Sequence, residues 1–577
     1  MADAKISELT ALTAAADADL FAIVDSSATE TKKITRQNLL GSIVISGTNV
    51  GIGATPSAKL DVNGDAEING LTVGRGAGDI SSNTAVGVNT LSSNTTGASN
   101  TASGLQALRS NTTGSNNTAT GTQALFSNTT GIQSSATGYQ ALYSNTTGNN
   151  NTATGFRALN SNTTGSENSA TGFQALYSNT TGGSNTATGL NALYSNTTGA
   201  SNTATGFKAL YSNTTGGSNS ANGREALYSN TTGASNNASG YRALYSNTTG
   251  SNNTASGTQA LYSNTTGIQS SAIGLQALYS NTTGNNNTAT GFQALFSNTT
   301  GTSNNATGIQ ALYSNTTGGS NSATGYTALR SNTTGGSNTA TGRNALFSNT
   351  TGSNNTATGY QALLSNTTGV QNTATGRNAL FSNTTGGNNA ANGYQALYNN
   401  TTGTGNTATG LQAGDVITTG SRNVIVGSTC DPSAADGNDQ IVVGNALTGK
   451  GDDTAFVGGT NGAYNEKNVT TWETTSDERI KKNITDNKTG LDVLSQIQVR
   501  NFEYRTPNEI TDLPSHAAIE KDGAQLGVIA QEIQKVLPEC VSENSTGVLS
   551  VNTDPLLWYL INAVKELKAE IQILKGN

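Results

Sequence analysis

A seventeen-residue repeat dominates this sequence and recurs about nineteen times between residues 90 and 413. Its consensus is N-T-A-T-G-x-Q-A-L-Y-S-N-T-T-G-x-x, and one leucine per unit keeps the period without slippage from Leu108 to Leu397. A short fixed period is typical of a stacked array, in which each unit packs on the next one. More than half of the chain is therefore expected to form a rod and not a globular core.

The repeat composition favours strands over helices. Seventeen residues are too few for two amphipathic helices, and the Thr, Asn and Gly content opposes helix formation. We predict two short strands per unit, N-T-A-T-G and Q-A-L-Y-S, stacked as a mainly β parallel solenoid or β-roll. Gly114, Gly121, Gly131 and Gly138 are expected to need a positive φ. The recurrent Asn columns should form amide ladders between coils.

The core of each coil is expected to be thin. Ala119, Leu125 and their equivalents are the only constantly apolar positions, so a lone coil should be marginally stable. The array resembles the head repeats of trimeric autotransporter adhesins, a β-roll that three chains share. We expect the aromatic column after the leucine to pack between chains; the alternative is a solvent-facing tyrosine ladder. This column contains Phe126, Tyr143, Tyr177, Tyr194, Tyr211, Tyr228 and Tyr245.

Composition shifts divide the chain into five regions. Residues 1–42 are expected to be an N-terminal virion-attachment region, because the short strand expected at 17–25 resembles the attachment ends of phage tail fibres. The pattern V-G-I-G-x-x-x-P-x-x-x-L-D-V-x-G within 43–89 resembles a shaft module of phage fibres. Residues 90–413 form the array, and 414–473 continue the stack irregularly as a distal, capping segment. Residues 474–577 form a charged α+β domain.

Charge and residue counts exclude several classes of function. The formal net charge of −7 gives no basic patch, so no nucleic-acid partner is expected. A single histidine, His516, excludes a multi-His metal site, and Cys430 and Cys540 form neither a disulfide framework nor a metal motif. We therefore expect no metal and no cofactor. Without a signal-type N-terminus or a run of eighteen apolar residues, we expect synthesis in the host cytoplasm and no membrane insertion.

The last hundred residues carry helical signals. A short helix is predicted at 490–497, a half-buried strand at 499–504, and a strand followed by a helix at 527–537. The final helix begins with Asp554 as N-cap, followed by Pro555. Its apolar residues follow a heptad seam, which predicts a coiled coil between chains; the alternative is a helix docked on its own domain. The seam consists of Leu557, Leu560, Val564, Leu567, Ile571 and Leu574.

Three motifs precede this helix: S-D-E-R-I-K-K-N-I at 476–484, F-E-Y at 502–504 and L-G-V-I-A-Q-E at 526–532. With the closing helix, they resemble the intramolecular chaperone auto-processing domain that ends many phage tail fibres, tailspikes and endosialidases. The resemblance implies self-cleavage between Thr475 and Ser476, with Ser476 and Lys481 as a catalytic pair. The chain would then be a single-turnover serine autoprotease with no evident activity on external substrates.

Elementary chemistry is compatible with this pair. A serine hydroxyl needs a base to take its proton, and a lysine can serve when burial lowers its pKa. Lys482 is an alternative base, and backbone N–H groups are the default donors to the oxyanion. We expect His516 to be structural or exposed.

Near-identical repeats create a register problem, because three chains displaced by one unit would make almost the same contacts. A C-terminal domain that trimerises first would align them. We therefore expect a homotrimeric phage tail fibre in the virion. Its N-terminus would join tail or baseplate proteins, and its rod would bind a host receptor, a glycan or an outer-membrane component. The variable column after the coil glycine could carry specificity: Phe156, Phe173, Leu190, Arg224, Tyr241 and Arg343.

Two alternatives remain open. A tailspike depolymerase would need paired carboxylates. In the array only the isolated Glu167 and Glu225 are acidic, whereas 414–473 holds Asp415, Asp431, Asp436, Asp439, Asp452 and Asp453. A bacterial trimeric surface adhesin would need a secretion signal and a membrane anchor, for which the sequence gives no indication.

Overall fold

The computed structural model describes residues 65–458 continuously. It also describes five strands between 20 and 62, and residues 463–465, 478–506, 509–510, 521–543 and 548–576. The chain forms two compact units, Met1–Thr474 and Thr475–Asn577. Each unit is considered by itself.

Short strands precede the rod, as the sequence predicts. Strand β1 (Leu20–Ile23) pairs antiparallel with β2 (Lys32–Thr35). Strand β4 (Asn49–Ile52) pairs antiparallel with β3 (Ile43–Ser46) and parallel with β5 (Leu60–Val62).

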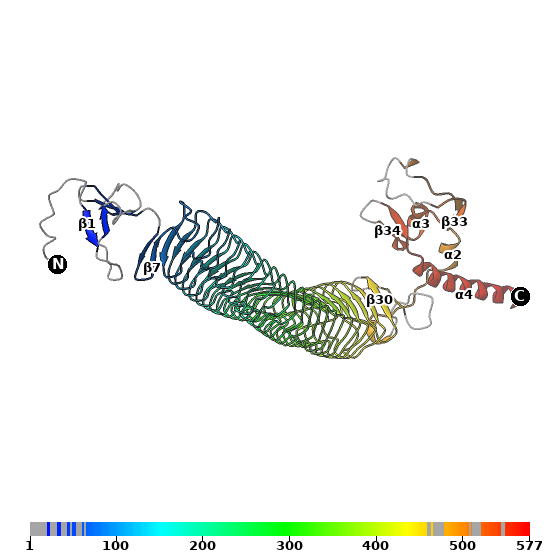
Figure 1. The fold of residues 1–577 in the computed structure, drawn as a ribbon. Helices are drawn as coiled ribbons and strands as arrows, with labels where there is room; N and C mark the ends of the chain where they lie inside the picture. The colour runs from blue at the N-terminus through cyan, green and yellow to red at the C-terminus, as the bar shows by residue number, and fades with distance from the viewer. Residues whose placement is uncertain are drawn as a thin grey trace. The chain divides into compact units, whose positions relative to one another are not determined.

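One continuous sheet forms the rod, which Figure 1 shows as a stack of thin coils. It begins with β6 (Ala66–Ile68), β7 (Leu71–Gly74) and β8 (Thr84–Gly87), paired antiparallel. From β8 onwards each strand pairs in parallel with the next, seventeen residues further along the chain, through about 22 coils. Strands β9 to β28 are Thr101–Ser103, Thr118–Thr120, Ser135–Thr137, Thr152–Thr154, Ser169–Thr171, Thr186–Thr188, Thr203–Thr205, Ser220–Asn222, Asn237–Ser239, Thr254–Ser256, Ser271–Ile273, Thr288–Thr290, Asn305–Thr307, Ser322–Thr324, Thr339–Thr341, Thr356–Thr358, Thr373–Thr375, Ala390–Asn392, Thr407–Thr409 and Val424–Val426.

The parallel stack continues beyond the sequence repeat. Strand β29 (Ile441–Gly444) keeps the seventeen-residue spacing, and β30 (Ala455–Gly458) follows after fourteen. Strand β31 (Ala463–Asn465) then pairs antiparallel with β30. In these coils larger apolar residues take over the interior: Ile417, Ile425, Cys430, Val442 and Phe456 are buried. The segment after residue 413 thus continues the stack with a different core.

The prediction of two strands per unit is wrong, because only the T-A-T segment is a strand and Q-A-L-Y-S forms a turn. Ala124 and Leu125 are adjacent and both fully buried, whereas neighbouring residues of a flat strand point to opposite faces. The chain solves this with left-handed backbone at Gln123 (φ 58°) and Leu125 (φ 51°). The bend turns both apolar side chains inward. Burial of Ala124 and Leu125 offsets a left-handed backbone cost of roughly 1–2 kcal/mol per residue.

The glycine prediction is right for one column and wrong for the other. Gly121 and Gly138 have φ values of 127° and 134°. Gly114 and Gly131 do not adopt a positive φ, and close packing explains them instead. A Cβ on Gly131 would lie 2.5 Å from Oδ1 of Asn128 and 2.6 Å from the carbonyl oxygen of the next coil, Gly148. Glycine is required there by space.

Asparagine ladders run through the interior, as predicted. In one column the amide Nδ2 of each Asn donates to Oδ1 of the Asn one coil earlier, at 2.7–2.9 Å, from Asn400 back to Asn94. In a second column Oδ1 of Asn185 accepts the backbone N–H of Asn202 at 3.0 Å. Both columns are fully buried together with one Leu and two Ala per coil. Each chain therefore encloses a core of its own, part apolar and part amide.

The C-terminal unit is a small α+β domain. The elements that the sequence assigns to 490–497, 499–504 and 527–537 are present within or beside those bounds, as is the closing helix, whereas the sequence does not predict the strands Val541–Glu543 and Leu549–Val551. Ile533, Leu537 and Cys540 form its buried centre. The elements are η2 (Glu478–Ile480), α2 (Leu491–Leu494), β32 (Arg500–Phe502), β33 (Gln525–Gly527), α3 (Ala530–Val536), η5 (Pro538–Cys540), β34 (Val541–Glu543), β35 (Leu549–Val551) and α4 (Asp554–Gly576). Strands β32 and β33, and β34 and β35, form antiparallel pairs.

Candidate functional site

Only one member of the predicted Ser–Lys pair lies within the described residues. Lys481 directly follows the single turn η2, and its backbone N–H donates to the carbonyl of Glu478 at 3.1 Å. Its side chain is exposed, as is that of Lys482. Thr475, Ser476 and His516 lie outside the described residues. The catalytic pair, the cleavage site and the role of the histidine therefore stay predictions.

The segment after the first motif is fastened to the closing helix. The side chain of Asn562 in α4 donates to the carbonyls of Asn487 (2.9 Å) and Thr489 (3.3 Å). The backbone N–H of Leu491, at the start of α2, donates to the carboxylate of Glu566 at 2.6 Å. Helix α4 thus positions the chain that leads from the predicted nucleophile into the domain.

Helix α4 has two apolar faces with different roles. Leu556 and Tyr559 pack against the buried centre of the domain, Ala563 is buried, and the phenol of Tyr559 donates to Glu539 at 3.0 Å. The predicted heptad seam lies on other positions, and all six of its residues are 42–76% exposed. The helix therefore docks on its own domain and also presents a free apolar seam, so the two alternatives drawn from the sequence are compatible.

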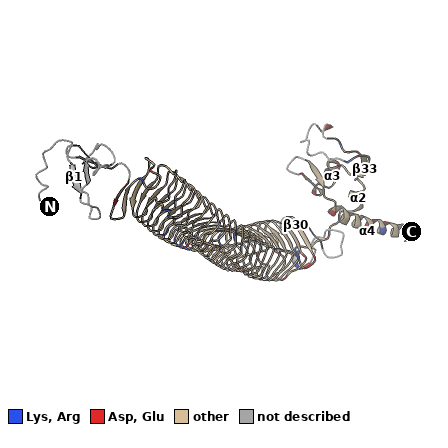
Figure 2. Ribbon diagram, viewed as in Figure 1, with Lys and Arg blue, Asp and Glu red and all other residues tan. Residues whose placement is uncertain are grey.

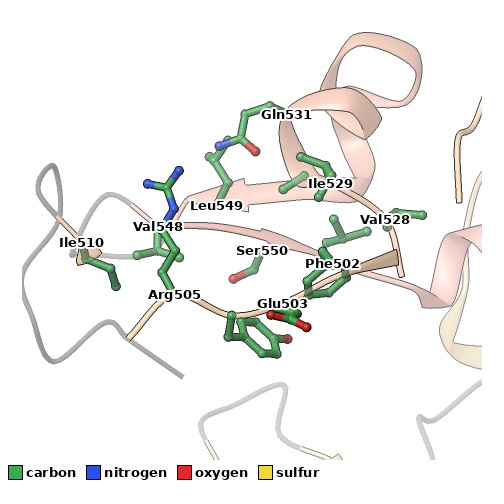
Figure 3. Close-up of a pocket in the computed structure, with 13 residues that line it drawn as sticks. Phe502, Glu503, Arg505, Ile510, Val528, Ile529, Gln531, Val548, Leu549 and Ser550 are labelled. Carbon is green, nitrogen blue, oxygen red and sulfur yellow. The ribbon is translucent and has the colours of Figure 1, made fainter. Parts of the chain in front are cut away.

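The second and third motifs meet around one pocket of about 480 Å³. Its lining comes from three segments, 502–505, 528–531 and 548–551, with Ile510 at one side, and Figure 3 shows these residues as sticks. Beside the first two segments, Arg500 donates two hydrogen bonds to the carboxylate of Glu532, at 2.9 and 3.2 Å. Polar groups of Glu503 and Ser550 lie among apolar neighbours. The motifs thus build one surface of the domain.

On the rod, aromatic rings form a stacked ladder along the column after the core leucine. From Tyr177 to Tyr313 consecutive rings are nearly parallel, with centroids 5.1–5.2 Å apart. The rings are half-buried and cover one another's faces. Neighbouring coils of the same chain therefore cover the faces of the rings, and the expected packing of this column against a partner chain stays a prediction.

Two further columns complete a surface that we call the aromatic face. It consists of the residue after the coil glycine, the residue that follows it, and the aromatic ladder. In one coil these are Tyr241, Arg242 and Tyr245; the guanidinium of Arg242 lies 5.1 Å from the Tyr241 ring centroid and 5.3 Å from that of Tyr245. The middle column is mostly Gln and forms its own amide ladder, as from Gln140 to Gln123 at 2.8 Å.

Every Lys and Arg between residues 84 and 413 belongs to this face. All of them lie over aromatic rings, with the charged group 5.1–5.9 Å from a ring centroid. Sequence reasoning missed this alignment, which a tabulation of charges by repeat position would have revealed. The eight cations are Arg109, Arg157, Lys208, Arg224, Arg242, Arg330, Arg343 and Arg377.

One carboxylate is embedded in the aromatic face. Glu225 occupies a Gln position, is almost buried, and accepts a 2.6 Å hydrogen bond from Arg242. Although burial raises it, the hydrogen bond and charge of Arg242 bring the pKa of Glu225 below its usual value. The carboxylate is therefore ionised and neutralises part of the local positive charge.

A second acidic feature lies at the C-terminal end of the rod. Asp415 and Asp431 share a side-chain hydrogen bond, and burial followed by the neighbouring Asp415 raises the pKa of Asp431 to about 6. Two carboxyls in direct contact are closer than the roughly 5 Å or more that glycoside hydrolysis uses. Within the described residues, no cluster of three or more His, Cys, Asp or Glu could hold a metal ion. The pair gives no support to the depolymerase alternative.

Comparison with known proteins identifies the C-terminal domain. Residues 476–542 match the family model described as the chaperone of endosialidase. No curated protein and no solved structure matched the chain. Among the described residues, no helix has the length and apolar character needed to cross a membrane. The chain thus joins a β-solenoid rod to a chaperone-of-endosialidase domain, a combination that fits a phage tail fibre with a C-terminal chaperone.

Proposed function

We propose that this chain is a homotrimeric tail fibre of a phage virion. Its C-terminal domain would align three chains and then cut itself off between Thr475 and Ser476. The observation that carries the proposal is the free seam of α4, six exposed apolar residues at heptad spacing on a helix already docked through another face. The family match, which begins at Ser476, supports the same assignment.

Trimerisation through this seam would remove a large apolar surface from water. Single exposed apolar residues are common on protein surfaces, but a continuous row of them marks an interaction site. The seam of α4 is such a row, with six exposed Leu, Ile and Val side chains. Coiled-coil packing buries such a row between helices. Because α4 also fastens the segment around Asn487 and Leu491, assembly of three helices would bring three copies of the first motif close together.

Cleavage would follow from the position of the serine. As the first residue after the scissile bond, Ser476 can direct its Oγ at the carbonyl carbon of Thr475. The C–N bond breaks, the nitrogen becomes the free amine of Ser476, and water hydrolyses the resulting ester to leave the Thr475 carboxylate. A lysine base needs a desolvated environment, whereas Lys481 is exposed in the single chain. Burial of Lys481 by partner chains would couple cleavage to correct assembly.

The rod explains why such a domain is needed. Its coils bury the same side chains in every repeat, so a displacement of one chain by seventeen residues changes few contacts. Alignment of the chains from the C-terminal end removes this ambiguity of register. After release of the domain, the stability of the rod would be kinetic, because it would be set by the rate of unfolding. The N-terminal region would join the tail or baseplate, and the rod would contact the host receptor.

The proposal is tested by light scattering and mass spectrometry of the purified full-length chain, whose mass is 58.5 kDa. We expect a trimer and a C-terminal fragment that starts at Ser476. Substitution Ser476→Ala should give an uncut trimer, Lys481→Ala should slow cleavage, and Lys482→Ala should not. Cleavage by the Ser476→Ala variant would contradict the assignment of Ser476 as the nucleophile. A monomeric wild-type chain would contradict the proposal of a trimeric fibre.

A further inference from the structure

The distribution of charge on the rod is uneven in a way that its composition conceals. Between residues 84 and 413 there are eight cations and two carboxylates, and the rod in Figure 2 is almost uniformly tan. All eight cations occupy the three columns of the aromatic face, and Glu225 is the one carboxylate among them. Glu167 lies at a different repeat position. A nearly uncharged rod therefore carries a net charge of +7 on one face.

We infer that the aromatic face binds an acidic polysaccharide, laid along the rod. This deepens the proposed function, on which it rests, by naming the chemical class of the host-surface ligand. The site is linear and long: sixteen coils separate Arg109 from Arg377, which corresponds to roughly 77 Å at a strand spacing of about 4.8 Å. A chain-like polymer suits such a track.

The side chains of the face suit carboxylated or otherwise anionic sugars. A guanidinium stacked over a ring, as Arg224 lies over Phe207 at 5.4 Å, still presents its N–H donors at its edge, where a carboxylate can accept them in pairs. Glutamine amides beside the cations offer further donors and acceptors. Rings of the outer column are 37–49% exposed, including Phe156 and Tyr326. The face thus combines apolar contact, neutral hydrogen bonding and sparse positive charge.

Charge density distinguishes this ligand from nucleic acid. Eight cations span roughly 77 Å, so the mean spacing between successive cations along the rod is about 11 Å. Duplex DNA carries one phosphate charge per about 1.7 Å, so most of its charges would meet no cation on this track. A polysaccharide with an acidic group on only some of its sugars matches the spacing better.

A second copy of the chain is a poorer partner for this face. Two such faces would place like charges opposite each other, which costs free energy at an interface. The ladder rings also stack within one chain, at 5.2 Å between Tyr194 and Tyr211, so their broad surfaces are already covered. Charge complementarity therefore favours an anionic partner.

The test uses the full-length protein and two polymer probes, hyaluronan with one carboxylate per disaccharide and neutral dextran of similar length. We expect binding to hyaluronan that weakens with added salt, and no binding to dextran. The triple variant R224Q/R343Q/R377Q should lose at least about tenfold in affinity. E225Q, which restores the Gln of its column and removes the one negative charge, should bind more tightly than wild type.

Lys450→Gln is the matched control, because Lys450 also lies over a ring, 4.7 Å from the Phe456 centroid, but away from the aromatic face. It should bind like wild type. Unchanged hyaluronan binding by the triple variant, equal binding of dextran, or tighter binding of duplex DNA would overturn the inference. Light scattering on the same samples separates the two proposals. A cleaved trimer that does not bind hyaluronan would contradict only the inference about the ligand. An uncleaved monomer that binds hyaluronan would contradict only the proposal of a self-cleaving trimeric fibre.

Discussion

The amide Nδ2 of Asn230 donates to Oδ1 of Asn213, one coil earlier, at 2.8 Å, and also to the carbonyl of Gly233 at 2.9 Å. Asn247 repeats the arrangement by donating to Asn230. One buried side chain therefore satisfies polar groups in three consecutive coils. This column is fully buried, so its amide groups cannot hydrogen-bond to solvent. The ladder supplies the partners that they would otherwise lack.

Asn230→Ala should open the rod locally. The substitution removes the donor to Asn213 and Gly233 and the acceptor for Asn247, so we expect a loss of about 1–3 kcal/mol in the opening free energy of these coils. Hydrogen exchange of residues 213–250 measures it. Asn237→Ala makes the same change on the exposed face of a strand and should stay within about 0.5 kcal/mol. Equal effects of the two variants would show that the ladder contributes nothing special.

Gly240→Ala should be more damaging than Gly217→Ala. Gly240 has a φ of 133°, and a Cβ would lie 2.6 Å from the carbonyl oxygen of Gly257 in the next coil. We expect a cost of about 1–3 kcal/mol, read from the midpoint of urea unfolding. At the repeat position of Gly217 other coils carry Ala200 and Ala234, so that variant should unfold like the wild type. An unchanged urea midpoint for Gly240→Ala would contradict the close spacing of the coils at this position.

Leu560→Gln combined with Leu567→Gln should abolish trimer formation. Both residues belong to the exposed seam of α4, at 52% and 45% exposure, and neither touches the buried centre of the domain. The domain should therefore fold while the chains remain separate, which light scattering detects. Ile573→Gln removes an apolar residue that is more exposed, at 68%, but lies off the seam, and should leave the trimer intact. A trimeric double variant would place the contact elsewhere.

The end of the rod should become less stable as pH rises from about 4 to 6. Asp431 has a pKa raised to about 6, against about 3.9 for an unfolded Asp, so between these values the folded state holds the extra proton. The free energy of unfolding of this end of the rod therefore falls as pH rises through this window, and it stays at the lower value above the window. Asp431→Asn should flatten the dependence and stabilise residues 414–458 at pH 7, measured by hydrogen-exchange protection factors.

Asp436→Asn changes an exposed carboxylate of the same segment and provides the comparison. It should leave the pH dependence in place. If the two variants behave alike, the contact between Asp415 and Asp431 does not control the stability of this end.

The periodic parts of the fold could be predicted from the sequence, because repetition itself reports stacking. The strand at Thr118–Thr120, the buried Leu125 and the Asn ladders follow directly from constant columns. The turn around Gln123 and Leu125 could not be predicted, since left-handed backbone at non-glycine residues is set by the closure of the coil and the burial of two adjacent side chains.

The candidate sites were predictable to different degrees. The seam residues of α4 could be identified by their spacing, but the separate docking face through Leu556 and Tyr559 depends on the three-dimensional packing of the domain. The pocket between the second and third motifs joins segments far apart in the chain. The cation alignment was legible in the sequence, although only the structure shows that Arg242 lies between two ring columns.

Both ends of the rod sheet reverse direction: β7 runs against β8 at one end, and β31 runs against β30 at the other. A foreign rod that tried to prolong the parallel stack beyond β31 would meet an edge strand of opposite polarity, which hinders open-ended polymerisation at that end. The number of repeats encoded in the sequence therefore sets the length of the rod. Insertion or deletion of one repeat would change it by about 4.8 Å, a single strand spacing.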